Sequence, residues 1–86
     1  MKQNKDIQMA IKHCRFMKDR QYRNFLSCKS LLEKELSSLS VKSEEELTKK
    51  DLLLLISRNC DYMRALSLYN YYKDELTRLV ADNERR

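Results

Sequence analysis

Few residues in this sequence have side chains able to do chemistry, and their spacing does not suit it. His13 is the only histidine, and Cys14 follows it directly, so the pair could be interpreted as a base beside a thiol nucleophile. Adjacent residues of a helix point about 100° apart and do not face each other. The sequence therefore predicts no catalytic pair at this position.

The three cysteines, Cys14, Cys28 and Cys60, are the other reactive candidates. Zinc sites use closely spaced pairs of ligands, and a disulfide framework uses an even number of cysteines. We therefore expect no metal and no cofactor, and three reduced, half-buried thiols that pack as small hydrophobic groups in a reducing cytoplasm. A regulatory thiol is the alternative.

The composition is unusual in having no glycine and no proline among 86 residues. Glycine-rich phosphate loops, dinucleotide fingerprints and nucleophile elbows all need glycine, so these enzyme classes are excluded. Hairpins and strand ends also depend on both residues, which argues against a β-rich domain. The sequence predicts a non-enzymatic, all-α protein.

Apolar residues recur at helical spacing along nearly the whole chain, which predicts a single helical domain over 1–86. They form two series: Ile7, Ile11, Cys14, Phe25, Cys28, Leu32, Leu36 and Leu39, then Leu52, Leu55, Ile56, Met63, Leu66, Tyr69, Leu76 and Val80.

Three polar stretches divide these series. Serine-rich residues 37–43 mark the main boundary, and residues 18–21 and 58–61 interrupt each half. We expect helices over 5–17, 20–39, 44–58 and 61–83, arranged as a small bundle of two stacked antiparallel hairpins. The alternative is one long two-helix hairpin, with helices over 5–39 and 44–83. The second half could start near 44, capped by Ser43 with Glu46, or near 49, capped by Thr48 with Asp51.

The two halves resemble each other when the chain is shifted by forty residues. The identical pairs are Tyr22/Tyr62, Leu26/Leu66, Ser27/Ser67, Glu35/Glu75, Leu36/Leu76 and Leu39/Leu79. The segment from Asp61 to Leu66 resembles the start of the second helix of a tetratricopeptide repeat, where a tyrosine (here Tyr62) precedes a small residue (here Ala65) by three positions. Phe25 replaces the small residue in the first half, and the family's turn glycine and closing proline are missing. The resemblance implies stacked helical hairpins that bind other proteins.

Positive charge is concentrated in the N-terminal third. The chain carries a net charge of +5, and residues 1–29 hold eight basic residues against two acidic ones. Four of the basic residues, Lys5, Lys12, Arg15 and Arg23, are expected roughly opposite the apolar positions. They form either a solvated face or a contact for phosphates or an acidic protein surface.

Tyrosines are concentrated in the second half and suggest an interface, where this residue is enriched. Tyr62, Tyr69 and Tyr72 share one helical stripe, whereas Tyr71 points elsewhere and is the better interface candidate. The stripe could equally be core, with its hydroxyl groups reaching the surface.

These observations favour a small cytoplasmic protein–protein interaction module: an adaptor, a regulator or a secretion-type chaperone. Its partner would be another protein or a second copy of the chain, held through an apolar helical face. No apolar run is long enough for a membrane span. One alternative is a nucleic-acid-binding regulator that uses the basic N-terminal third, and another is a homo-oligomeric structural protein.

Overall fold

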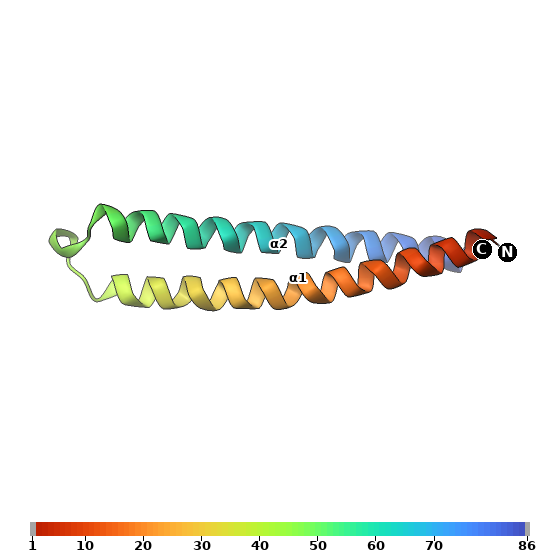
Figure 1. The fold of residues 1–86 in the computed structure, drawn as a ribbon, viewed down its shortest axis with the longest axis horizontal. Helices are drawn as coiled ribbons and strands as arrows, with labels where there is room; N and C mark the ends of the chain where they lie inside the picture. The colour runs from red at the N-terminus through yellow and green to blue at the C-terminus, as the bar shows by residue number, and fades with distance from the viewer. Residues whose placement is uncertain (1, 86) are drawn as a thin grey trace.

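The fold is a single long helical hairpin. The computed structural model describes residues 2–85, and the side chains of residues 5–85. Helix α1 spans Lys2–Ser40, a short 3₁₀ turn, η1, spans Glu44–Glu46, and helix α2 spans Lys49–Glu84. The two helices run side by side over a body of 66 × 15 × 15 Å, and both termini lie at the end opposite the loop (Figure 1). The described residues contain no strand, and the all-α prediction is confirmed.

The preferred arrangement of two stacked hairpins is wrong, and the alternative of one long hairpin is the observed one. Residues 18–21 and 58–61 lie inside continuous helices. Polar side chains interrupt an apolar stripe without interrupting the backbone hydrogen bonds, and neither stretch contains glycine or proline to break them. Asp19 and Asn59, expected near helix ends, are exposed residues on helical surfaces.

The two helices meet along a seam whose positions alternate in steps of four and three. In α1 the seam is Ile7, Ile11, Cys14, Lys18, Gln21, Phe25, Cys28, Leu32, Glu35 and Leu39. In α2 it is Asp51, Leu55, Arg58, Tyr62, Ala65, Tyr69, Tyr72, Leu76, Leu79 and Asn83. All twenty are buried or half-buried, and a sustained 3.5-residue period is the pattern of an antiparallel coiled coil.

Aromatic side chains fill the middle of the seam and set the pairing of the helices. The Phe25 ring lies 5.3 Å from the Tyr62 ring and 6.4 Å from the Tyr69 ring, measured between centroids. Tyr22 and Tyr69 are 5.2 Å apart. Nearer the loop, Leu32 lines one groove together with Leu55 and Asn59. Along the hairpin axis, these contacts place Leu31 of α1 beside Asn59 of α2.

The loop ends at a well-formed helix cap. Thr48 is the N-cap of α2: its Oγ1 accepts a hydrogen bond from the Asp51 amide, and the Thr48 amide donates to Asp51 Oδ2, each at 3.1 Å. Of the two predicted helix starts, the one near 49 is confirmed. Ser43 instead precedes η1, and its hydroxyl donates to Glu46 Oε1.

Asp51 also joins the loop to the helix, which makes the cap sensitive to pH. The Lys42 ammonium donates to Asp51 Oδ2 at 2.9 Å, and this bond, with that from the Thr48 amide, lowers the pKa of Asp51. A carboxyl whose pKa is lower in the folded state stabilises the fold above its unfolded pKa, and that contribution is lost as pH falls through the folded value.

We therefore expect the melting temperature of the wild-type chain to fall as pH drops below about 4. The Asp51→Asn variant should melt lower at neutral pH and converge with wild type in acid, as followed by circular dichroism. Asp61→Asn, at an exposed position of the same helix, is the control and should differ little from wild type at any pH. A constant gap between Asp51→Asn and wild type from neutral to acid pH would contradict the assignment.

Candidate partner-binding surface

A second apolar stripe lies beside the seam, on one side of the hairpin. On α2 it comprises Leu52, Ile56, Asn59, Met63 and Leu66, again in steps of four and three. On α1 the same side carries Leu26, Lys29, Glu33 and Leu36. We call these nine residues the lateral face.

Contacts show that both halves of the lateral face lie on the same side of the hairpin. Leu36 lines a groove of about 290 Å³ together with Ile56 and Asn59, above the seam residues Leu32 and Leu55. Residues three and four apart on a helix are neighbours, so the rest of each stripe continues along this side. Farther from the loop, Tyr22 meets Tyr69 on this side, and the Lys73 ammonium lies 5.8 Å from the centre of the Tyr69 ring.

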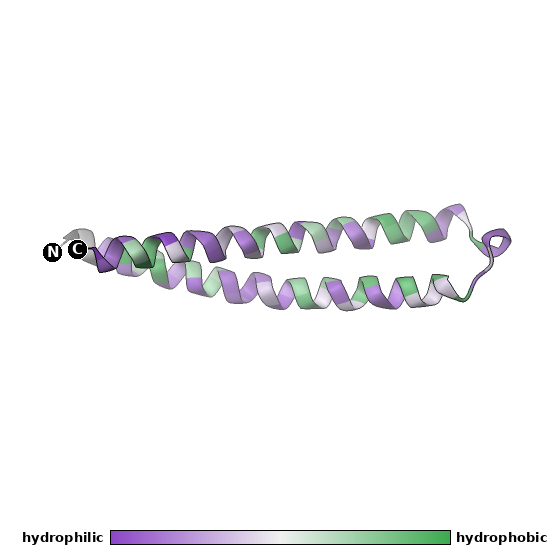
Figure 2. Cartoon of the chain, turned by 180° about the vertical axis from the view of Figure 1, so that it is seen from behind, coloured by the Kyte–Doolittle hydropathy of each residue, from purple (hydrophilic) through white to green (hydrophobic). Residues whose placement is uncertain are grey.

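Most apolar side chains of this face are open to solvent, and only Leu66 is half-buried. Ile56 is 58% exposed, Met63 52%, Leu36 48%, Leu52 47% and Leu26 42%. By contrast, only Ile11, Cys14 and Ala65 are buried among the described side chains. Figure 2 shows the hydrophobic colour concentrated in the first turns of α2, beside the loop. An exposed apolar surface of this kind, interrupted by Asn59 on α2 and by Lys29 and Glu33 on α1, is a candidate interaction site.

The opposite side of the hairpin is less apolar. Leu31, Leu54 and Leu68 are 38–43% exposed there. They alternate with charged residues of the same side, Lys34, Asp61 and Arg64. These charged residues interrupt the apolar surface and leave small groups, such as Leu68 with Tyr71 one turn away, which is 60% exposed.

The tyrosines divide between seam and surface as their spacing predicts. Tyr62, Tyr69 and Tyr72 are half-buried seam residues, and Tyr71 is 60% exposed. Tyr71 packs edge-on against Tyr72, with ring centroids 5.1 Å apart. The seam positions show that Tyr62 and Tyr69 belong to the packing between the helices. A partner-binding role for the four tyrosines stays a prediction.

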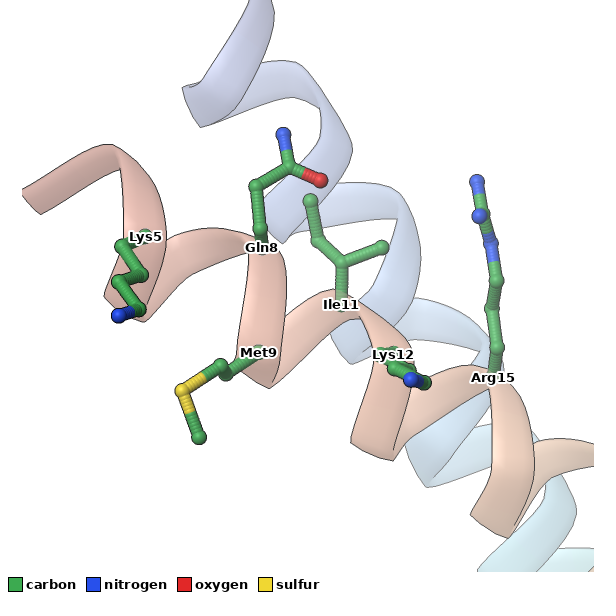
Figure 3. Close-up of a pocket in the computed structure, with 6 residues that line it drawn as sticks. All are labelled: Lys5, Gln8, Met9, Ile11, Lys12 and Arg15. Carbon is green, nitrogen blue, oxygen red and sulfur yellow. The ribbon is translucent and has the colours of Figure 1, made fainter.

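Three of the four predicted basic residues lie together at the open end of the hairpin. Lys5, Lys12 and Arg15 line a shallow groove of about 460 Å³ with Gln8, Met9 and the seam residue Ile11, so the prediction that they lie opposite the apolar positions is wrong for these three. Figure 3 shows all six on the first turns of α1, with α2 behind. Arg23 is exposed but lies about 16 Å farther along α1 from Lys12. The groove offers positive charge to an anionic group, with few fixed donors to orient one.

The thiols and the histidine occupy separate environments. Cys14 is buried, Cys28 half-buried and Cys60 exposed, so the expectation of three half-buried thiols holds only for Cys28. Burial first, and then the Glu75 carboxylate, raise the pKa of the Cys14 thiol, which disfavours the nucleophilic thiolate. His13 is exposed beside Tyr72, with ring centroids 6.5 Å apart.

Charged pairs near Cys14 are structural. Arg78 binds Glu75 one turn before it and Asp82 one turn after it, the latter at 3.4 Å. The hydrogen bond from Arg78 lowers the pKa of Glu75. Among the described residues, no three His, Cys, Asp or Glu side chains gather closely enough to hold a metal ion.

Comparison with protein-family models, with curated proteins and with solved structures returns no match for this chain. Within the described residues, neither helix has a stretch apolar enough to cross a membrane.

Sequence reasoning missed the lateral face because it merged two stripes into one series. In the single apolar series of the second half, Leu52, Ile56, Met63 and Leu66 stand together with the seam residues Leu55 and Tyr69. The spacing between successive residues separates the two stripes, because within each stripe the residues are alternately four and three positions apart. Asn59 is polar and lies in the middle of the second stripe, so the apolar residues alone do not show this spacing.

Proposed function

We propose that this chain is a non-enzymatic protein–protein interaction module that binds its partner through the lateral face. The observation that carries the proposal is the exposed apolar stripe of α2, flanked by Leu26 and Leu36 of α1, on a hairpin with only three buried side chains among those described. Burial of apolar surface is the main driving force of protein association. An adaptor, a regulator and a secretion-type chaperone are all compatible with such a face.

The tetratricopeptide resemblance supports the same class of function. The segment from Asp61 to Leu66 lies within α2, so its tyrosine and alanine serve here as seam residues. Repeats of that family bury one face against a neighbouring hairpin. A hairpin that leaves its lateral face open would be completed in the same way, by another helical element.

The groove at Lys5, Lys12 and Arg15 favours a second candidate, a nucleic-acid-binding regulator. Salt separates the two functions, because apolar burial is not screened by ions whereas phosphate contacts are. On duplex DNA each neutralised phosphate adds about 0.9 to the slope of log affinity against log salt.

The test uses the tagged chain in an extract of its own cells, with a short DNA duplex and a short RNA as defined probes. We expect the bound protein, including any untagged copy of the chain, to remain at high salt. Substituting Ile56 and Met63 with glutamine should abolish this binding. Phe16→Gln is the matched control, because Phe16 is 59% exposed outside the lateral face, and it should bind as wild type does.

Changing Lys12, Arg15 and Arg23 together to glutamine tests the basic residues, since glutamine keeps helix propensity and removes three charges. We expect this variant to keep its fold and its partner, with slower association if the partner is acidic. Binding to the nucleic-acid probes that is steeply salt-dependent and lost in this variant would overturn the proposal in favour of the second candidate.

A further inference from the structure

The hairpin exposes more surface than a chain of its mass normally does. A compact monomer of 10.4 kDa is expected to expose about 5,400 Å². This chain exposes 6916 Å², an excess of about 1,500 Å² over the compact value. If two copies each buried that excess, the interface would total about 3,000 Å², which lies within the range of obligate homodimers.

The lateral face of α2 is self-complementary. Its residues are arranged almost symmetrically about Asn59: Ile56 and Met63 lie on either side, and Leu52 and Leu66 lie seven residues before and after. When two such helices pack antiparallel with Asn59 at the centre, Leu52 meets Leu66 of the second copy and Ile56 meets Met63. A two-fold interface forms each contact twice, once in each direction, and this spacing pairs apolar side chains with apolar side chains in both.

The lateral face of α1 has the same symmetry, and its charges alternate in sign. Leu26, Lys29, Glu33 and Leu36 are symmetric about the point midway between Lys29 and Glu33. In the antiparallel arrangement Leu26 meets Leu36 of the second copy, and Lys29 meets Glu33. Neither charged residue has an ion-pair partner within the part of the chain whose side chains the structure describes.

The two centres of symmetry lie at the same level of the hairpin. The contacts across the seam place the midpoint of Lys29 and Glu33, next to Leu31, beside Asn59. One two-fold axis, lying in the interface plane and crossing both helices at this level, therefore satisfies both stripes at once. The fold of a single hairpin does not require the two centres of symmetry to lie at the same level.

Charge complementarity extends beyond the apolar contacts. In this arrangement the loop of each copy, with Glu44, Glu45 and Glu46, lies over the level of Arg15 and Lys73 of the second copy. Arg15 and Lys73 are exposed on the same side of the hairpin as the lateral face. The open ends, with Lys5 and Lys12, extend past the overlap and avoid a like-charge contact.

We propose, building on the proposed function, that the occupant of the lateral face is a second copy of this chain, packed antiparallel so that two hairpins form a four-helix bundle around an axis at Asn59. Neighbouring helices are antiparallel throughout this bundle. Asn59 meets its counterpart at the axis, where a single polar residue in an apolar seam specifies register at some cost in stability.

Sedimentation equilibrium over a range of chain concentrations gives the first test. We expect a mass twice the 10.4 kDa of one chain. A monomer at every concentration would overturn this inference while leaving the lateral face as the site for another protein. The proposed function is overturned by different results: partner binding that survives the change of Ile56 and Met63 to glutamine, or salt-dependent binding of the nucleic-acid probes as described above.

A charge swap tests the register. Lys29→Glu and Glu33→Lys each place like charges opposite one another twice per dimer, so each variant alone should dimerise about tenfold more weakly or worse. Mixing the two variants restores opposite charges, and the mixed dimer should regain wild-type affinity. Lys34→Glu, on the opposite side of α1, is the matched control and should leave dimerisation unchanged.

Circular dichroism of each variant shows whether it is folded, so that a loss of dimerisation can be distinguished from a loss of folding. The arrangement at Asn59 would be overturned if neither substitution changed the dimerisation affinity. It would also be overturned if the mixture dimerised no more tightly than each variant alone. Recovery in the mixture cannot arise from a folding defect, because each chain in it still carries its own substitution.

Discussion

Replacing Phe25 with alanine is expected to lower the free energy of unfolding by about 2 to 3 kcal/mol. Phe25 is the hub of the seam, with its ring near those of Tyr22, Tyr62 and Tyr69 at centroid distances of 6.3, 5.3 and 6.4 Å. It is only half-buried, so the loss should lie below that of a fully buried phenylalanine. For a chain of this size, that loss is a large part of the total stability.

Urea unfolding followed at 222 nm measures this effect, with wild type and variants at one chain concentration because association changes apparent stability. Phe16→Ala is the matched control: Phe16 is 59% exposed on the same helix, and its loss should cost about 0.5 kcal/mol or less. Equal effects of the two substitutions would show that the aromatic cluster does not hold the hairpin together.

The second large effect is expected from Ala65→Asp. Ala65 is 1% exposed, the least exposed of the buried side chains, and lies on the seam between Tyr62 and Tyr69. An aspartate there would place an unpaired charge between two packed helices, which costs about 3 kcal/mol or more. We expect the variant to lose its cooperative unfolding transition at neutral pH.

Ser67→Asp is the control for helix propensity, because it introduces the same residue two positions away at an exposed site. It should unfold within about 0.5 kcal/mol of wild type. Part of the helicity of Ala65→Asp should return in acid, where the introduced carboxyl group is neutral. A stable Ala65→Asp variant at neutral pH would mean that the helices do not pack at this position.

Both predictions concern the centre of the seam, where the hairpin is best packed. Toward the loop the seam is flanked by exposed leucines, and toward the termini by the basic groove. The loop-side half therefore depends most on a partner for its stability, since a partner that binds only the folded state raises stability by mass action. Amide exchange near the loop should slow when the lateral face is covered.

The helical class and the start of α2 follow from the sequence alone, for local reasons. The absence of glycine and proline removes the residues that end helices and make tight turns, and regular apolar spacing rewards helix formation. Thr48 and Asp51 form their cap between residues three apart, so the signal lies within one helical turn. The same periodicity predicts that Tyr62, Tyr69 and Tyr72 share one stripe and that Tyr71 points elsewhere, but the packing of the two helices decided that this stripe lies in the seam.

The tertiary structure decided two matters that local reasoning could not. The polar stretches at 18–21 and 58–61 interrupt the apolar pattern, yet α1 and α2 pass through them, because each helix is supported along its whole length by the other. The lateral face, too, could be found only once the pairing of the two helices was known. Leu36 and Ile56 belong to different helices, and only the antiparallel register brings them, with Asn59, to one side of the hairpin.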